Sequence, residues 1–156
     1  MIEINIPGFG RLELDHLVLD YNGTMALDGQ LIEGVSERLI ALAREITIHV
    51  LTADTFGRVE ENVSDIPCEV HILPVEAQDI GKMNYVDRLG AARTVCIGNG
   101  RNDAMMLKKA ALGIAVVQDE GAAAAAVLSA DVVAPDILSA IDLIIRPLRL
   151  TATLRS

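Results

Sequence analysis

The feature that most constrains this chain is a series of short, unbroken apolar runs separated by segments with helical spacing. The runs cover 17–19, 46–51, 70–72, 95–97 and 114–117, with a shorter one at 131–133. Unbroken runs predict strands that are buried on both faces. The intervening segments predict helices around 35–43, 56–63, 84–89, 105–110 and 137–145. Strands that alternate with helices predict a doubly wound α/β fold, a parallel sheet between two helical layers.

The first fifteen residues follow a different pattern. Ile2, Ile4 and Ile6 alternate with polar residues, and Leu12 and Leu14 continue the alternation after a turn that contains two glycines. This predicts an N-terminal β-hairpin that extends the main sheet with antiparallel strands. Because no Pro-, Gly- or Ser-rich linker follows, we expect a single domain over 1–156. Its parts are the hairpin (1–15), the core (16–144) and a C-terminal tail (145–156) for which no element is predicted.

Composition excludes several classes of protein. The 13 basic and 22 acidic side chains give a net charge of −9, which argues against binding to nucleic acid. The longest uncharged stretches, 110–118 and 121–130, are shorter than the roughly 18 residues of a membrane span. The sequence does not open with a basic segment followed by an apolar one, so we expect a cytoplasmic protein with no membrane partner. Cys68 and Cys96 are expected to be free thiols.

Polar clusters follow three of the predicted strands. They are Asp-Tyr-Asn-Gly-Thr at 20–24, Thr-Ala-Asp-Thr at 52–55 and Gly-Asn-Gly-Arg-Asn-Asp at 98–103. Ligands of open parallel sheets bind just beyond the carboxyl ends of the strands, so these clusters should share one edge. An isolated lysine, Lys82, stands at the start of a predicted helix that can lean over the same edge.

These residue types suit phosphoryl transfer through an aspartyl intermediate. A carboxylate at a strand end can attack phosphorus. A hydroxyl, backbone amides and a lysine can hold the phosphate oxygens, while Mg²⁺ held by carboxylates and a carbonyl offsets their charge. Asp20, Thr52, Lys82 and Asp103 supply these parts.

The same segments resemble the four ordered motifs of the haloacid dehalogenase superfamily, most closely as they occur in the phosphorylation domain of P-type ATPases. Residues 20–24 are similar to the Asp-x-x-Gly-Thr nucleophile motif, and 51–54 to the pumps' Thr-Gly-Asp. Residues 98–103 resemble Gly-Asp-Gly-x-Asn-Asp, and 113–116 and 130–133 resemble the pump segments that follow. Any one motif is weak, but four in the right order are specific, and the resemblance extends over about 16–144.

The resemblance implies a magnesium-dependent phosphohydrolase or ATPase-like enzyme that acts on a small phosphorylated substrate or a nucleotide. It makes Asp20 the nucleophile, with Asn22, Thr52 and Lys82 completing the catalytic set. It also implies two binding sets, a phosphate set of Gly23, Thr24, Thr52, Ala53 and Lys82 and a Mg²⁺ set of Asp20, Asn22, Asn99 and Asp103.

Two positions depart from the superfamily pattern. Superfamily phosphatases usually have an aspartate two residues after the nucleophile, which protonates the leaving group and then activates water, whereas this chain has Asn22. An amide cannot carry that proton, so hydrolysis of an aspartyl phosphate is expected to be slow. Asn99 also replaces an aspartate, which removes a negative charge beside the metal and predicts weaker Mg²⁺ binding.

The spacing of the motifs predicts a capless core. Asp20 and Lys82 are separated by a segment already filled by two strands and two helices, which leaves no room for a cap or a nucleotide-binding insertion. Related capless proteins often cover the open cleft with a neighbouring subunit. We therefore expect a homo-oligomer, a dimer or a tetramer, with a monomer that admits a large substrate as the alternative.

Alternatives remain for the function, the fold and the histidines. The chain could be a regulatory or binding relative that keeps the fold and the metal site but turns over slowly. Receiver domains also combine a strand-end aspartate with a threonine and a lysine, but they carry their acidic pair after the first strand instead of the third cluster. His16, His49 and His71 lack ligand spacing in the sequence and are expected to be core or edge residues instead of zinc ligands.

Overall fold

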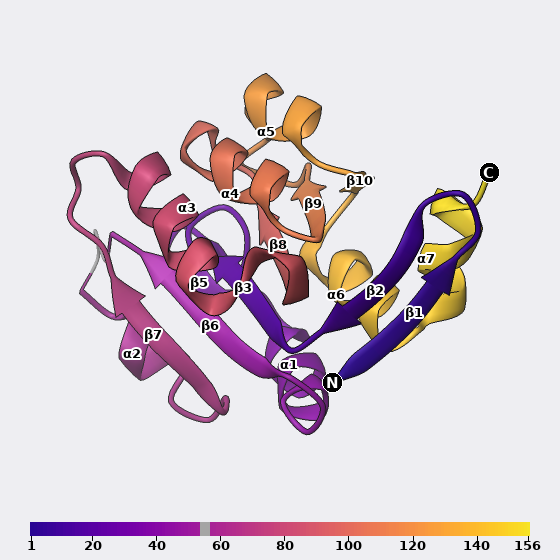
Figure 1. Ribbon diagram of the computed structural model, residues 1–156. Coiled ribbons are helices and arrows are strands. Elements are labelled where there is room, and N and C mark those ends of the chain that lie inside the picture. Colours follow the sequence, from indigo (N-terminus) through magenta and orange to yellow (C-terminus); the bar gives the residue numbers. More distant parts are fainter. Residues whose placement is uncertain (54–56) are drawn as a thin grey trace.

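A parallel sheet forms the centre of the computed structural model, which describes residues 1–53 and 57–156 (Figure 1). Among these residues, six strands lie in the order β10-β9-β8-β3-β6-β7, and every neighbouring pair is parallel. The strands are β3 (His16–Asp20), β6 (Thr47–Thr52), β7 (Cys68–Ile72), β8 (Thr94–Gly98), β9 (Leu112–Val116) and β10 (Val132–Ala134). The predicted doubly wound α/β fold is confirmed.

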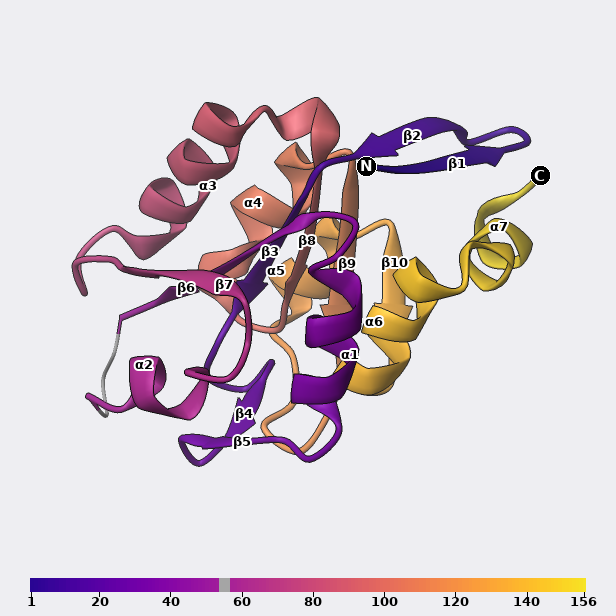
Figure 2. The same cartoon turned by 90° about the horizontal axis from the view of Figure 1, so that it is seen from below.

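Helices cover both faces of the sheet (Figure 2). The first face carries α1 (Val35–Leu42), α2 (Val59–Asn62) and α6 (Ile137–Ile145), and the second carries α3 (Gln78–Leu89), α4 (Ala104–Lys109) and α5 (Ala124–Ser129). Successive strand residues point to opposite faces, so Leu17 and Leu19 join the first apolar cluster while Val18 joins the second. Burial on both sides explains why these strands read as unbroken apolar runs.

The N-terminal hairpin is present, but it does not extend the main sheet as the sequence pattern predicted. Strands β1 (Ile2–Ile6) and β2 (Gly10–Leu14) form a separate two-stranded antiparallel sheet. The reason is positional. Only Asp15 separates β2 from β3, and β3 already has β6 and β8 as neighbours, so the hairpin has no free edge to join. It projects past the amino end of the sheet and contacts the C-terminal helix instead (Figure 1).

Three helices differ from their predicted bounds. Helix α3 begins at Gln78, so Lys82 lies in its second turn and not at its start. The helix predicted around 56–63 is the single turn α2, and Phe56 lies outside the described residues. The tail forms α7 (Pro147–Leu154), which begins with a proline. Proline is tolerated there because a backbone N–H at the first helical position has no acceptor within the helix.

A small hairpin after β3 was not predicted from the sequence. Strands β4 (Ala26–Leu27) and β5 (Gln30–Leu31) pair across Asp28 and Gly29. The Asp-Gly dipeptide is a strong hairpin signal, and both residues have positive φ angles, 50° and 79°. The remaining elements are two short 3₁₀ turns, η1 (Ala91–Arg93) and η2 (Arg101–Asp103).

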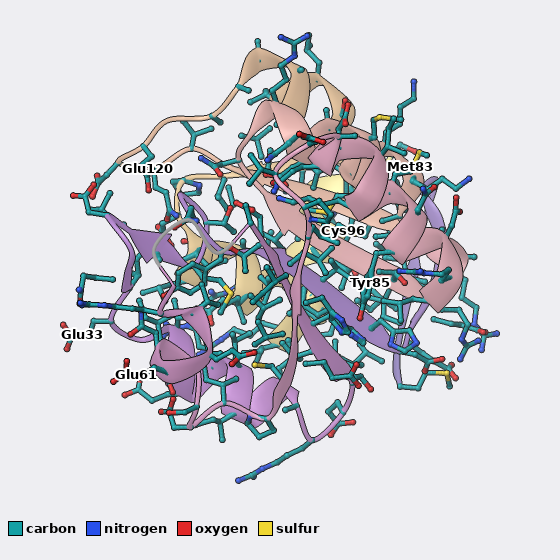
Figure 3. All side chains as sticks on the ribbon, turned by 90° about the vertical axis from the view of Figure 1, so that its left-hand side faces the viewer. Glu33, Glu61, Met83, Tyr85, Cys96 and Glu120 are labelled. Carbon is teal, nitrogen blue, oxygen red and sulfur yellow. The ribbon has the colours of Figure 1, made fainter. Side chains whose placement is uncertain are left out.

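The surface agrees with the acidic composition. Glu33, Glu61 and Glu120 are exposed and point away from the protein (Figure 3). Within the described ranges, none of the helices combines the length and the apolar character needed to cross a bilayer. Cys68 and Cys96 are both free, as expected.

Candidate active site

The order of the strands determines where a ligand can bind. From β3 the chain runs outward to β6 and β7, and then returns to β8 on the other side of β3. The connections that leave β3 and β8 therefore diverge, and such a switch point opens a crevice at the carboxyl ends of the strands. Asp20 ends β3, and the loop that leads to Asp103 follows β8. Two of the predicted clusters thus meet at the switch point.

Lys82 joins these two clusters. Its Nζ donates to Asp20 Oδ1 at 2.6 Å and to Asp103 Oδ1 at 2.7 Å. All three residues are buried, with 7%, 1% and 0% of Asp20, Lys82 and Asp103 exposed. The second turn of α3 thereby places an ammonium group between carboxylates that come from two different strand ends. Short, charge-assisted bonds of this kind hold the three groups in a fixed arrangement.

The charges of this trio do not balance. One ammonium faces two carboxylates, so the buried group has a net charge of −1 when all three ionise. Burial, followed by the charge of Asp103, raises the pKa of Asp20 to about 7, although Lys82 and Thr24 act in the opposite direction. Burial alone would lower the pKa of Lys82, but the two carboxylates raise it, so the lysine keeps its proton. A site with surplus buried negative charge is suited to a divalent cation.

The loop after Asp20 surrounds this carboxylate with polar groups. Thr24 is fully buried, and its hydroxyl lies 3.1 Å from Asp20 Oδ2 and 3.2 Å from Asn99 Oδ1, so its single proton is shared between the two acceptors. Gly23 has a φ of +79°, and a Cβ at this position would lie 2.5 Å from Asn99 Nδ2. The turn therefore requires glycine both for its conformation and for space.

Asn22 carries a buried side-chain oxygen, Oδ1, without a hydrogen-bond partner among the described residues. A buried carbonyl oxygen without a donor is unfavourable by about 1–3 kcal/mol. A ligand that approaches Asp20 could relieve this.

The loop after β8 positions Asp103. The backbone N–H groups of Asn99 and Gly100 donate to Asp103 Oδ2 at 3.0 and 2.8 Å. A Cβ on Gly98 would lie 2.5 Å from Asp103 Cγ, so only glycine leaves room for the carboxylate. Asn99 itself donates from Nδ2 to the carbonyl of Gly121 at 3.1 Å.

The predicted second cluster lies on the neighbouring strand. Thr52 is the last residue of β6 and is buried, and in the register of the sheet Leu51 lies beside Asp20. Thr52 and Ala53 are therefore at the same edge as Asp20. The other two positions of this cluster, Asp54 and Thr55, lie outside the described residues.

Gln118 is a site residue that the sequence interpretation missed. Its Nε2 donates to the carbonyls of Gly23 and Thr24 at 2.9 and 2.6 Å, and its Oε1 accepts from the N–H of Ile137 at 3.0 Å. It thus braces the loop after Asp20 against the start of α6. The signal was available, because Gln118 is the polar residue that follows the apolar run 114–117, as Asp20 follows its own strand.

A cavity opens at the same edge. It has a volume of about 710 Å³ and is lined on one side by Ala53 and on the other by the loop and turn at 100–102, with Gln78 and Asp79 between them. Its size is in the usual range for a small-molecule site. Another cavity, of about 620 Å³, lies at the opposite end of the strands, where Asp15, Thr47 and Glu69 line it. That end is far from the trio, so we assign no role in its chemistry to the second cavity.

Several solved structures with a similar architecture are phosphatases. The 3-deoxy-D-manno-octulosonate 8-phosphate phosphatase of Moraxella catarrhalis, in complex with magnesium, phosphate and its sugar, has a TM-score of 0.69 at 16% identity over 91% of this chain and 94% of its own. The cobalt-bound enzyme of Haemophilus influenzae has a TM-score of 0.72 at 14% identity over 92% and 94%. A phosphoserine phosphatase gives 0.64 at 14% identity over 85% and 100%.

These neighbours define the class of the fold. The chain has the fold of the haloacid dehalogenase superfamily hydrolases, which confirms the resemblance seen in the sequence and favours it over the receiver-domain alternative. The finer likeness to the phosphorylation domain of P-type ATPases remains a prediction.

One comparison of sequences is much closer. The uncharacterized protein MJ0073 of Methanocaldococcus jannaschii is 49% identical over 83 residues, which are 51% of this chain and 89% of that protein. The chain belongs to the same family as MJ0073. A second uncharacterized protein of that organism, MJ0072, is 51% identical over 39 residues, which are 25% of this chain and 89% of that protein. No family model matches the chain.

Proposed function

We propose that this chain is a magnesium-dependent phosphohydrolase that transfers a phosphoryl group through an aspartyl phosphate on Asp20. The observation that carries the proposal is the bridge from Lys82 to Asp20 and Asp103 at the switch point of the sheet. A structural ion pair needs only one carboxylate. A lysine between two carboxylates at a ligand-binding edge fits a nucleophile, its electrostatic partner and a metal ligand.

The reaction has two displacements. In the first, a carboxylate oxygen of Asp20 attacks phosphorus, a new O–P bond forms, and the bond to the leaving oxygen breaks. In the second, water attacks phosphorus, the bond to Asp20 breaks, and inorganic phosphate leaves with a proton released to solvent. Lys82 and the hydroxyls of Thr24 and Thr52 would hold the phosphate oxygens, together with backbone N–H groups near Gly23 and Ala53.

Proton transfer must involve solvent in both displacements: a leaving group takes its proton from water in the first, and the attacking water loses its proton to solvent in the second. Asn22 stands where superfamily phosphatases carry the acid and base, and an amide neither donates nor accepts a proton at neutral pH. The first step therefore favours substrates whose leaving group needs no proton, such as acyl phosphates and nucleotides. The second step is slow, so the aspartyl phosphate persists.

The oxygen donors at this edge suit Mg²⁺. Asp20 and Asp103 supply carboxylates, Asn22 supplies a carbonyl and Asn99 lies next to them, which is the hard-oxygen donor set that this ion prefers. The surplus negative charge and the unpartnered Oδ1 of Asn22 agree with this assignment. When bound, the ion would offset the repulsion between the Asp20 carboxylate and the phosphate.

A binding or regulatory role is the second candidate. Asn22 and Asn99 favour it, since each removes a carboxylate from the superfamily pattern. In that case the chain binds a phosphorylated compound or metal at the same edge without net turnover.

An assay with a matched pair of variants tests the proposal. Wild-type protein, Asp20→Asn and the control Asp65→Asn, whose carboxylate is exposed, are compared on acyl phosphates, sugar phosphates and nucleotides with and without Mg²⁺. We expect magnesium-dependent phosphate release from the wild type and the control but not from Asp20→Asn. Beryllium fluoride should bind to the wild type only with Mg²⁺ present. An unchanged binding isotherm in Asp20→Asn would refute Asp20 as the nucleophile, and binding without turnover would favour the second candidate.

We also propose that the chain forms a homo-oligomer, a dimer or a tetramer, in a reducing compartment such as the cytoplasm. Apolar side chains remain exposed beside the candidate active site, where Ile72, Val75 and Ile80 are 53%, 79% and 47% exposed. A neighbouring subunit would cover them. Light scattering across a concentration series measures the mass, and a strict monomer at tens of micromolar would overturn the oligomer while leaving the chemistry at Asp20 intact.

A further inference from the structure

All three histidines of the chain lie together beneath helix α3, at a place that the proposed phosphatase chemistry does not use. His16 is on β3, His49 on β6 and His71 on the edge strand β7. His16 Nδ1 is 3.1 Å from His49 Nε2, and the ring centroids of His49 and His71 are 6.3 Å apart. Their spacing in the sequence had suggested unrelated core or edge residues, but the parallel register places them side by side.

Two further residues complete this histidine cluster. Glu69 on β7 lies opposite His49 in the sheet register. Tyr85 is on α3, one turn beyond Lys82, and points toward the sheet on the same side as Cys96 (Figure 3). Its hydroxyl is 2.9 Å from His49 Nδ1, and its ring centroid lies 4.6 Å from that of His71.

The separations between donor atoms fit a tetrahedral cation. Bonds of about 2.0–2.1 Å to nitrogen and oxygen give a tetrahedron with edges of about 3.4 Å. Glu69 Oε2 is 3.6 Å from His49 Nδ1 and 3.4 Å from His71 Nε2. One donor atom from each of these three residues lies within 4.8 Å of the others. Side-chain movements of about an ångström would close the site.

The histidine that lies deepest is held in a form that can coordinate. Burial lowers the pKa of His49 to about 4, so its imidazole is neutral at physiological pH, and burial raises the pKa of Tyr85 to about 12, so its hydroxyl keeps its proton. If Tyr85 donates to Nδ1, then Nε2–H donates to His16, and Nδ1 is 3.6 Å from Glu69 Oε2. A second hydrogen bond that fixes the tautomer is typical of histidines that bind metals.

The opposite side of the cluster is open. The side chains of His71 and Glu69 are 37% and 58% exposed, whereas that of His49 is 2% exposed. A cation can enter from solvent at the edge strand and keep a water molecule as its fourth ligand. Two imidazoles and one carboxylate favour a borderline cation of the zinc class over Mg²⁺, which prefers oxygen donors throughout.

We propose that His49, Glu69 and His71 form a second metal site, specific for Zn²⁺ or a similar first-row cation and distinct from the oxygen site at Asp20. His16 orients His49, and the Tyr85 hydroxyl turns away from Nδ1 when the cation binds. The site ties the edge strand β7 to the interior strand β6. This inference does not depend on the proposed phosphatase activity.

The test is a titration with Co²⁺, whose visible absorption reports tetrahedral coordination, in buffer that contains excess Mg²⁺ to occupy the oxygen site. The wild type should bind one equivalent with tetrahedral absorption, and Zn²⁺ should displace it and raise the unfolding temperature. His71→Asn and Glu69→Gln should each weaken binding by more than about tenfold, because even changes outside the ligand set cost about 10–100-fold. Both side chains are partly exposed, so neither substitution threatens the fold.

Two controls locate the bound ion. Glu60→Gln makes the same chemical change as Glu69→Gln at an exposed position and should leave the titration unchanged. Asp20→Asn, which removes a ligand of the oxygen site, should leave the tetrahedral absorption unchanged. Because the chain has only three histidines, their imidazole resonances can be assigned by single substitutions, and Zn²⁺ should shift those of His49 and His71. Co²⁺ binding that survives His71→Asn and Glu69→Gln, or no tetrahedral binding to the wild type, would overturn the site.

Discussion

Helix α3 contacts two polar clusters that differ in whether a buried basic side chain keeps its charge. Lys82 joins Asp20 and Asp103 at the carboxyl edge, and these three residues form the charged cluster. Tyr85, one turn further along α3, joins the histidine cluster. In the first cluster the buried lysine keeps its charge, because the two carboxylates beside it raise its pKa. In the second the buried imidazole of His49 gives up its charge, since burial lowers its pKa to about 4.

The difference determines what each cluster can bind. Under the proposed function, the surplus carboxylate of the trio would attract a hard cation, and that cation would offset the charge of a bound phosphate. In the proposed second site, two imidazole nitrogens and one carboxylate would instead select a softer cation by ligand type and geometry. The two proposals thus assign different chemistries to residues one turn apart on α3, because the strands beneath this helix offer oxygen donors at their ends and nitrogen donors along their length.

The largest expected effect concerns Asn22, which lies beside the charged cluster at the position of the superfamily's general acid and base. Asn22→Asp should raise phosphatase turnover by about 10²- to 10⁴-fold, because it restores a group that can donate and accept the proton. The lifetime of the aspartyl phosphate, measured by acid quench after labelling with a phosphorylated substrate, should shorten by the same factor. An unchanged lifetime in a correctly folded variant would show that Asn22 does not limit hydrolysis.

The charged cluster was predictable from the sequence, and the histidine cluster was not. Asp20 and Thr52 stand directly at the ends of apolar runs, and Asp103 closes the polar segment 98–103 that follows the run 95–97. Parallel strands bring their carboxyl ends to one edge whatever the exact register. Lys82 was uninformative by itself and was chosen for its place in the order of the motifs, and α3 starts six residues earlier than the pattern indicated.

The histidine cluster depends on details that an apolar pattern does not carry. His49 meets Glu69 only in the observed register of β6 and β7, and a shift by one residue would send His49 to the other face. Its contact with His16 further requires β6 to lie next to β3. Strand order and register come from packing across the whole sheet, so no local spacing of the histidines reveals them. The separate hairpin sheet has the same cause, since it follows from the central place of β3.

Removal of the buried ammonium group tests how far the two carboxylates of the charged cluster depend on the positive charge of Lys82. Lys82→Met should lower the free energy of unfolding by about 3–5 kcal/mol at neutral pH, because two buried carboxylates lose their partner. The control Lys109→Met breaks an exposed pair with Asp87 and should cost about 1 kcal/mol or less. Denaturant unfolding without metal measures both. Equal losses for the two variants would contradict the view that Asp20 and Asp103 rely on Lys82.

The histidine cluster predicts a dependence of stability on pH with a definite sign. In the unfolded chain His49 titrates near 6.5, whereas in the folded protein its pKa is lowered to about 4. Between these values the unfolded chain binds more protons, so the free energy of unfolding falls as pH falls through this window. Below pH 4, the titration of His49 has lowered the free energy of unfolding by about 3 kcal/mol relative to its value above pH 6.5.

His49→Gln should remove this contribution, so that the free energy of unfolding of the wild type falls relative to that of the variant as pH is lowered from 6.5 to 4. The measurement is denaturant unfolding in the presence of a chelator, so that no cation holds the neutral imidazole. The groups that face His49 are His16, His71, Glu69 and Tyr85, and all four remain in the variant. A wild-type profile parallel to that of the variant would mean that His49 accepts a proton without penalty.

The smallest expected effect is on the affinity of the charged cluster for its cation. Asn99→Asp adds a carboxylate beside Thr24, where the superfamily motif has one, and should tighten Mg²⁺ binding by about tenfold, since ligand charge governs affinity for such ions. The variant also loses the bond from Asn99 Nδ2 to the Gly121 carbonyl, so its metal-free form should be less stable by about 1 kcal/mol. Asn102→Asp places the same charge in the adjoining turn, where the side chain bonds to Gln78, and should change the affinity by much less. Calorimetric titration with Mg²⁺ compares the affinities of the wild type and the two variants. An equal gain in affinity in both variants would mean that the added charge acts by long-range attraction and not as a ligand of the metal.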